Sequence, residues 1–286
     1  MILDLLWQNS FALALGALAK SAPDWLKKRV RHRRLRSFFG AAATRRAAVA
    51  VAIPIMNPLT PEYFVGGRKV ERTTVLKPSR LGKDERWPVY GRVLHLDDYD
   101  ASEEVFGLLR DNGAREPVRV PDYEAVGEWR NQPIVVCLGS PFVNAALDEL
   151  LGLDTEGPRI TAHRMTETLE SYLVELREPS PLTLGVDHER AIGVIARLPN
   201  PETGDGAAVA IWGCRSESTL AAARYLHANF EQVAKWSEPG KPLIVLLAIR
   251  GRTWEQVTPM YVATDNTVKI EEPDLVRLYV RSTEGA

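Results

Sequence analysis

Short, uninterrupted runs of apolar residues constrain the fold of this 286-residue chain more than any other feature. Residues 134–138 (Ile-Val-Val-Cys-Leu) and 243–249 (Leu-Ile-Val-Leu-Leu-Ala-Ile) contain no charged or amide side chain. A strand that is apolar at every position, rather than at alternate positions, is typical of a strand buried on both faces of its sheet. Such a sheet needs cover on both faces, so these runs predict an α/β protein.

Helical patterns alternate with the predicted strands along the chain. We expect strands at residues 47–56, 92–96, 117–120, 134–138, 159–165, 192–198, 207–212, 243–249, 257–264 and 275–280. We expect helices at residues 100–112, 142–151 and 220–233, the last with apolar residues spaced by three and four. The prediction is a doubly wound, mainly parallel, Rossmann-like domain over residues 47–286. Within it, residues 57–90 are rich in Pro and Gly and are predicted to form a long excursion, with a small hairpin near residues 70–76.

A basic leader of residues 1–46 precedes this domain. It carries ten Lys or Arg against two Asp, whereas the rest of the chain carries 26 basic and 35 acidic residues. Residues 21–24 (Ser-Ala-Pro-Asp) form a helix start signal and Gly40 is a natural stop, so a basic helix is expected between them. Its aromatic residues could seat residues 20–39 on an anionic membrane or on nucleic acid. Equally, they could dock on the acidic body, including across the interface of a homo-oligomer.

Cysteine usage and hydropathy bear on the compartment. Two cysteines can build neither a zinc site nor a disulfide framework, which favours a reducing compartment and a cytoplasmic protein. The longest early apolar run, residues 11–19, is shorter than the roughly 20 residues that a membrane span needs. No Lys or Arg precedes it, as one would in a signal peptide.

Two predicted strands end in glycine and lead through small polar residues into a helix. We define these segments as the two strand-end corners. The first corner contains Gly139, Ser140 and Asn144, and the second contains Gly213, Arg215, Ser216, Ser218 and Thr219. Free amides at a helix N-terminus favour phosphate or carboxylate, and ligands gather at the carboxyl ends of parallel strands. The corners are therefore predicted to bind a nucleotide-like or other anionic small molecule, with ordinary turns and helix caps as the alternative.

Two acidic residues extend this prediction. Glu217 lies beside the second corner and is the candidate catalyst if the chain cleaves N-glycosidic bonds of NAD or nucleosides. Asp98 follows a predicted strand and could hold a ribose hydroxyl. No metal site is predicted and no cofactor is identified, because one acidic cluster does not make a set of metal ligands. Phosphate-loop, Gly-x-Ser-x-Gly and Gly-x-Gly-x-x-Gly motifs are absent, which disfavours NTPases, lipase-like enzymes and standard dehydrogenases.

At residues 134–144, and more weakly at residues 207–226, the chain resembles the Rossmann-type sensor and nucleoside-processing domains of bacterial defence systems. These comprise the SLOG, TIR and nucleoside deoxyribosyltransferase-like folds. They place a strand, a glycine and a small residue or proline against a nucleotide or nucleoside. The resemblance implies a nucleotide-binding sensor or regulatory domain, and Glu217 is the positional candidate for the catalytic glutamate that some members carry. The third hypothesis is an interaction or scaffold protein that works through its basic leader.

Overall fold

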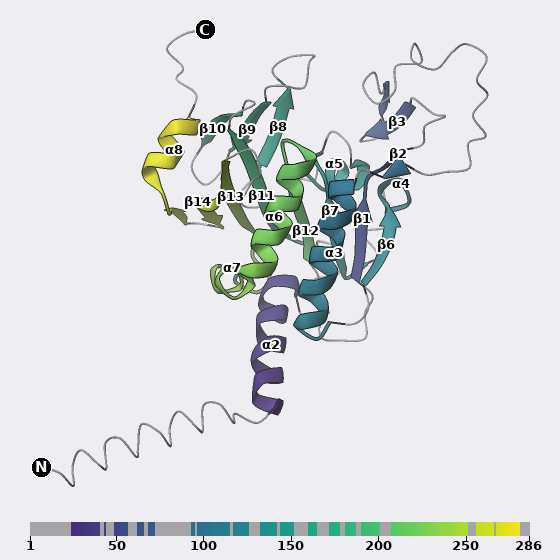
Figure 1. Cartoon of the computed structure of the whole chain (residues 1–286), viewed down its shortest axis with the longest axis vertical. Coiled ribbons are helices and arrows are strands. Elements are labelled where there is room, and N and C mark those ends of the chain that lie inside the picture. Colours follow the sequence, from purple (N-terminus) through teal and green to yellow (C-terminus); the bar gives the residue numbers. More distant parts are fainter. Residues whose placement is uncertain are drawn as a thin grey trace, which may run out of the picture.

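The computed structural model shows an α/β fold built on one large mixed sheet flanked by helices (Figure 1). It describes residues 24–40, 43, 49–56, 62–65, 68–71, 93–94, 96–114, 117–125, 132–141, 144–151, 160–164, 172–177, 181–186, 190–200, 207–250, 256–265 and 267–280. The main sheet has eight strands in the order β15-β14-β13-β11-β12-β7-β1-β6. Its central strands are buried along all or nearly all of their length, as the continuous apolar runs predict.

Four neighbouring strands form the parallel half of the main sheet. They are β1 (Val49–Ile53), β6 (Pro117–Pro121), β7 (Ile134–Leu138) and β12 (Ala207–Gly213). Strand β1 pairs in parallel with β6 and β7, and β7 pairs in parallel with β12. The carboxyl ends of all four strands therefore lie at one edge of the sheet, where ligands gather in open α/β proteins.

The other half of the sheet is antiparallel. It consists of β11 (Ala191–Pro199), β13 (Leu243–Arg250), β14 (Gln256–Thr264) and β15 (Val268–Ile270). Strand β11 also pairs antiparallel with β12, so the α/β class is confirmed but the mainly parallel arrangement holds for only half of the sheet. Seven residues separate β11 from β12, and strands joined by so short a connection pair antiparallel. Strands that are buried on both faces can pair in parallel or antiparallel. Apolar strands alone therefore did not predict that half of the sheet is antiparallel.

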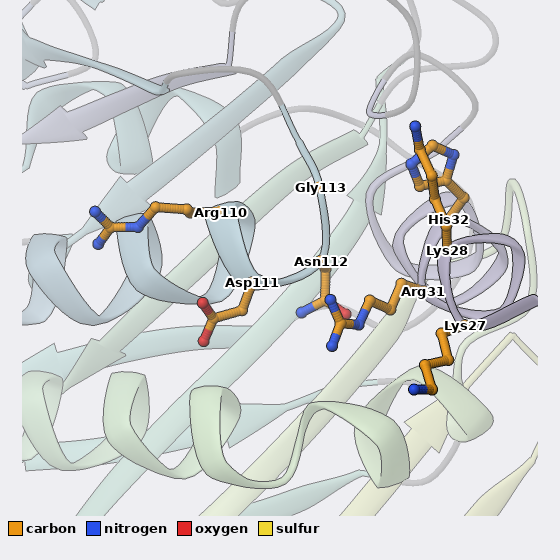
Figure 2. A pocket seen from close by; sticks show the side chains of 8 residues that line it. All are labelled: Lys27, Lys28, Arg31, His32, Arg110, Asp111, Asn112 and Gly113. Atoms are coloured by element: carbon orange, nitrogen blue, oxygen red, sulfur yellow. The ribbon is translucent and has the colours of Figure 1, made fainter. Parts of the chain in front are cut away.

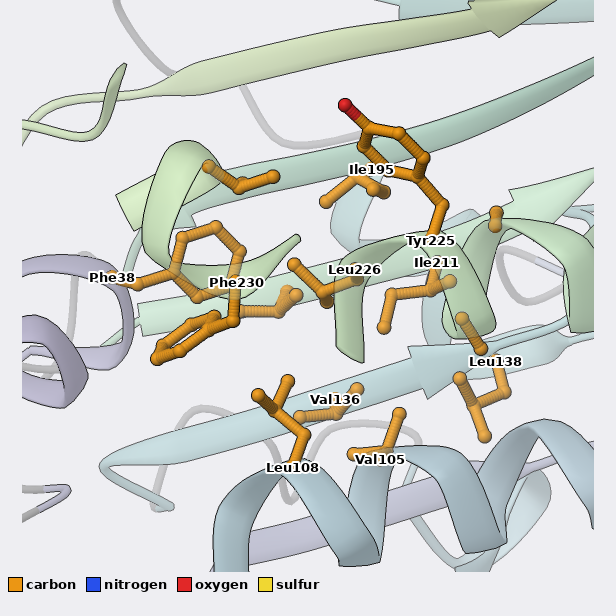
Figure 3. Close-up of a cluster of buried hydrophobic side chains, with 14 of the residues drawn as sticks. Phe38, Val105, Leu108, Val136, Leu138, Ile195, Ile211, Tyr225, Leu226 and Phe230 are labelled. Carbon is orange, nitrogen blue, oxygen red and sulfur yellow. The ribbon is translucent and has the colours of Figure 1, made fainter. Parts of the chain in front are cut away.

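One face of the main sheet is covered by four helices. These are α2 (Asp24–Phe39), α3 (Leu96–Asp111), α6 (Ser216–Ala228) and α7 (Phe230–Trp236). Figure 3 shows the resulting core, with Val105 and Leu108 of α3 and Leu226 of α6 packed over Val136 of β7. Residues 96–99, expected as a strand end and loop, form the first turn of α3, and the preceding strand is reduced to β5 (Val93–Leu94).

The opposite face is covered by short helices and a small sheet. These are α4 (Asp122–Ala125), α5 (Ala145–Leu151), α8 (Pro273–Tyr279) and the antiparallel strands β8 (Ile160–Arg164), β9 (Tyr172–Leu176) and β10 (Leu182–Val186). The strand predicted at residues 275–280 is wrong, because Pro273 starts a helix there. Cys137 and Cys214 carry reduced thiols, and both lie buried in the apolar cluster on this face.

Most of the excursion at residues 57–90 lies outside the described residues. Its described parts are β3 (Glu62–Val65) and β4 (Arg68–Glu71), which pair as an antiparallel hairpin a few residues before the predicted one. Just before it, β2 (Ile55–Met56) pairs with β5. Within the part of the chain that the structure describes, no helix is both long and apolar enough to cross a membrane.

The helix of the leader forms as expected and ends where the sequence indicates. Helix α2 runs to Phe39, and Gly40 follows in the left-handed conformation at φ +86°, donating its amide to Arg36 O at 3.0 Å. Leu35, Phe38 and Phe39 are fully buried in the core between the main sheet and the four helices that cover it. The last turns of α2 thus share the core of the α/β body. Of the two roles considered for the aromatic residues of the leader, Phe38 and Phe39 therefore take the one in which they dock on the body.

Candidate functional site: the strand-end corners and a basic groove

The two strand-end corners lie side by side in the sheet. Strands β7 and β12 are parallel neighbours, and Gly139 donates its amide to Ile211 O at 3.2 Å. Gly139 has φ +87°, a conformation that favours glycine over residues with a Cβ, so its place at the turn after β7 is explained by the backbone. The adjacency that a shared ligand would require is therefore present.

Asn144, at the first corner, is fully buried and has a structural role. Its side-chain amide donates to Leu138 O at 2.6 Å and to Ala52 O at 3.2 Å, and its Oδ1 accepts from Leu147 N at 2.9 Å. It thus caps the first turn of α5 and ties the ends of β1 and β7 together. These bonds occupy both the donor and the acceptor groups that a ligand would use.

The second corner is closed by the start of α6. A Cβ added to Gly213 would lie 2.2 Å from Ser218 Cβ, so the helix packs directly on the strand end. Thr219 is 1% exposed, and its Oγ1 accepts from Gly213 N at 3.1 Å. Ser218 is fully buried, and no described residue pairs with its hydroxyl. Gly213 therefore serves helix packing, and the hydroxyls of Ser218 and Thr219 are turned into the protein.

The remaining predicted residues of the corners lie nearer the surface. Ser140 and Arg215 are half-buried, with Arg215 at the N-cap position of α6, and Glu217 is exposed in its first turn. The side chain of Ser216 lies outside the described part. The adjacent Cys214 is buried, and this burial raises the pKa of its thiol to about 12, so the thiol is an inert apolar group here.

Asp98 belongs to another helix. It is 5% exposed in the first turn of α3, where a carboxylate is stabilised by the positive end of the helix dipole. Among the described residues, no group of three His, Cys, Asp or Glu side chains could hold a metal ion.

A second site, which sequence reasoning missed, is a basic groove between α2 and the C-terminal end of α3 (Figure 2). Its volume is about 520 Å³, and it is lined by Lys27, Lys28, Arg31 and His32 of α2 and by Arg110, Asp111, Asn112 and Gly113 of α3 and its C-terminal turn. Figure 2 shows Arg31 reaching from α2 toward Asn112. Gly113 has φ +80°, and a Cβ there would lie 3.3 Å from His32 Nε2, so the imidazole packs against the turn that ends α3.

The groove is held in shape because α2 is anchored beside it. Arg197, a fully buried residue of β11, donates its Nε to Phe38 O at 2.9 Å and its Nη1 to the carbonyls of Glu238 and Lys241, between α7 and β13. Burial lowers the pKa of its guanidinium to about 10, which leaves it charged at neutral pH. The only signal for it in the sequence is one arginine within the apolar strand at residues 192–198.

Helix α7 holds α2 on a second side. Ser37 Oγ donates to Ser237 O at 2.8 Å, and Ser237 Oγ donates back to Ser37 O at 3.0 Å. Arg34 pairs with Glu231 at 2.5 Å, and the rings of Phe38 and Phe230 meet edge to face with centroids 5.7 Å apart. The C-terminal half of α2 is therefore fixed, and its basic N-terminal half is held in a defined position.

A titratable cluster joins α3 to α6 next to the groove. His227 Nδ1 lies 2.8 Å from Glu104 Oε2, and its Nε2 lies 3.3 Å from Asp111 Oδ2. Partial burial alone would lower the pKa of His227, but the hydrogen bonds and charges of the two carboxylates outweigh it and raise the pKa. Asp111 also lines the groove and is its one carboxylate. When His227 is protonated, it therefore partly neutralises the negative charge of the groove.

Comparison with known proteins adds no relative, because no family model, curated protein or solved structure matches the chain. The fold and the two sites define an α/β protein with closed strand-end corners and an open basic groove.

Proposed function

We propose that the protein binds a phosphate-bearing small molecule of nucleotide size in the basic groove between α2 and α3, as a sensor or regulatory domain. The observation that carries the proposal is the charge of the lining. Four Lys or Arg side chains and one histidine surround a single carboxylate, Asp111. The ligand class is the one expected from the strand-end corners. The groove offers exposed donors, whereas Asn144, Ser218 and Thr219 of the corners are buried.

Charge and size both favour such a ligand. The C-terminal end of α3 contributes roughly half a negative elementary charge from its dipole. Together with Asp111 this offsets fewer than two of the four cations, so the groove is positive overall. Its volume of about 520 Å³ lies within the roughly 300–1,000 Å³ usual for small-molecule sites. Arg31 supplies a planar guanidinium fork suited to phosphate oxygens, while Lys28 acts as a point charge.

Calorimetric titration with pyrophosphate, ATP, NAD and ADP-ribose tests the proposal. A double variant, Lys28→Ala with Arg31→Ala, removes two of the groove's cations. We expect it to weaken binding at least tenfold, a change of about 1.4 kcal/mol, which is less than the roughly 1.5–3 kcal/mol that one charged hydrogen bond can contribute. The matched control is Arg29→Ala with Arg33→Ala, which removes two exposed arginines of the same helix that do not line the groove.

Two results would overturn the proposal. One is the absence of binding by all four ligands at millimolar concentration. The other is a groove variant that binds as tightly as the unmodified protein, because the ligand would then sit elsewhere. Loss of affinity in the control variant alone would count equally against the groove, since its residues lie on a different side of α2.

A further inference from the structure

A stripe of three arginines lies on α2 opposite its docked side. Arg29, Arg33 and Arg36 are spaced by four and three residues, so they share one side of the helix. All three are exposed. At 100° per residue their mean direction lies roughly opposite that of Phe38 and well away from that of Leu35, two of the three side chains that α2 buries in the core. We call this surface the arginine stripe.

The stripe carries charge that the protein does not neutralise within its described part. No described residue forms an ion pair with any of the three arginines, whereas neighbouring Arg34 is paired with Glu231. The arginines of α2 therefore differ according to the side of the helix they occupy. Arg34 faces α7 and anchors the helix, whereas the stripe faces solvent. Three aligned positive charges repel one another, and a negatively charged partner would reduce this repulsion.

We propose that the arginine stripe binds the phosphate backbone of a nucleic acid. The stripe extends about 10 Å along the helix, at 1.5 Å per residue. A duplex carries one negative charge per roughly 1.7 Å of its axis, so this length faces several phosphates at once. Guanidinium groups contact such oxygens with two parallel hydrogen bonds. Backbone contacts alone carry no sequence information, so binding is expected to be independent of sequence.

A membrane surface suits the stripe less well. A helix that lies on a membrane needs a wide apolar face beside its cations. The exposed part of α2 offers only Leu26 and Val30 among the described side chains, each 41% exposed. Three arginines add about 1 kcal/mol each near an anionic membrane, which alone is marginal for stable attachment. The charge density of a nucleic acid is higher, and it favours this partner.

The position of α2 restricts the contact to the helix. Figure 1 shows α2 extending away from the main sheet. Residues 47–286 carry 26 basic and 35 acidic residues, so the body repels a polyanion. Screening in physiological salt acts over about 8 Å, which allows a projecting helix to bind while the body stays outside the range of strong repulsion. The contact is therefore small and strongly dependent on salt.

Fluorescence anisotropy with a labelled 20-base-pair DNA duplex, followed as a function of salt, tests the inference. Three phosphate contacts predict that the affinity falls with salt at a logarithmic slope of about 2.7, or about 0.9 per contact. Replacing Arg29, Arg33 and Arg36 with Ala should remove most of this slope. Replacing all three with Lys should preserve it, because the charge remains.

Controls separate this inference from the proposed function and from other partners. A variant with Lys235, Lys269 and Arg277 changed to Ala removes three cations elsewhere and should keep the slope. The stripe variant should still bind pyrophosphate in the groove as tightly as before. The inference is overturned if the Ala variant retains the slope. It is also overturned if the protein does not bind DNA but sediments with vesicles containing phosphatidylserine, which would assign the stripe to a lipid surface.

Discussion

Replacing Gly213 with Ala tests why a glycine ends β12. The new Cβ would lie 2.2 Å from Ser218 Cβ and 2.6 Å from the carbonyl carbon of Ser218. Non-bonded carbon atoms are most favourable at about 3.5–4.0 Å, so α6 would have to retreat from the sheet by more than an ångström. Overpacking a dense core costs about 1–3 kcal/mol. Because the obstacle here includes helix backbone, we expect Gly213→Ala to lower the free energy of unfolding by about 3 kcal/mol, the top of that range.

Urea unfolding followed by circular dichroism measures this loss against a matched control. In Gly185→Ala the nearest atom to the new Cβ is Tyr279 O at 3.9 Å, an ordinary contact, so stability should change by less than about 0.5 kcal/mol. Adding Ser218→Gly to Gly213→Ala removes the 2.2 Å contact but leaves the backbone contacts, so it should restore only part of the loss. If Gly213→Ala is as stable as the unmodified protein, the packing explanation is refuted and Gly213 again becomes a candidate for close approach of a ligand.

Three further predictions concern residues that tie elements together. Asn144→Ala removes three buried hydrogen bonds and a helix cap, and should cost roughly 2–4 kcal/mol in urea unfolding. Arg197→Met removes the donor to Phe38 O at the end of α2 and to Glu238 O after α7, so α2 should exchange its amide hydrogens faster, with a loss of about 2–3 kcal/mol. The raised pKa of His227 gives stability that is complete below the unfolded value near 6.5 and is lost as the pH rises through the folded value. His227→Gln should therefore flatten the fall in stability as the pH rises above the unfolded value, by at most about 1 kcal/mol, whereas an unchanged pH profile would exclude the cluster with Glu104 and Asp111.

The strand-end corners illustrate how far local sequence patterns reach. A glycine after a buried strand predicted the turn at Gly139, and the turn is present. The two corners are also neighbours, as a shared ligand would require, but this depends on the strand order, which the pattern does not give. The same pattern did not reveal whether the polar side chains face a ligand or the protein. Asn144 and Thr219 turned inward because strand ends and a helix start had unpaired backbone groups at those points. Which backbone groups need a partner depends on which strands are neighbours, and the order of residues along the chain does not give that information.

The basic groove shows the opposite limitation. The cations of α2 were evident from the sequence, but their partner surface comes from residues 110–113, about 80 positions away. Nothing in that stretch distinguishes it from an ordinary helix end with a glycine stop. The groove arises because anchors that are also remote in sequence, Arg197 among them, fix the end of α2 beside α3. Sites made by two elements of high sequence separation are therefore visible only in the fold.

The anchoring of α2 links the packing of the molecule to both proposed binding surfaces. A cationic helix that is free in solution loses conformational entropy when it binds, and repulsion among its charges opposes its formation. Here Leu35, Phe38 and Phe39 are buried, so folding of the core already fixes the direction of the helix before any partner arrives. The groove cations and the arginine stripe then lie on different sides of one rigid element. Weakening the anchor at Arg197 should therefore reduce binding at both surfaces together, whereas changes to either set of cations should affect only one.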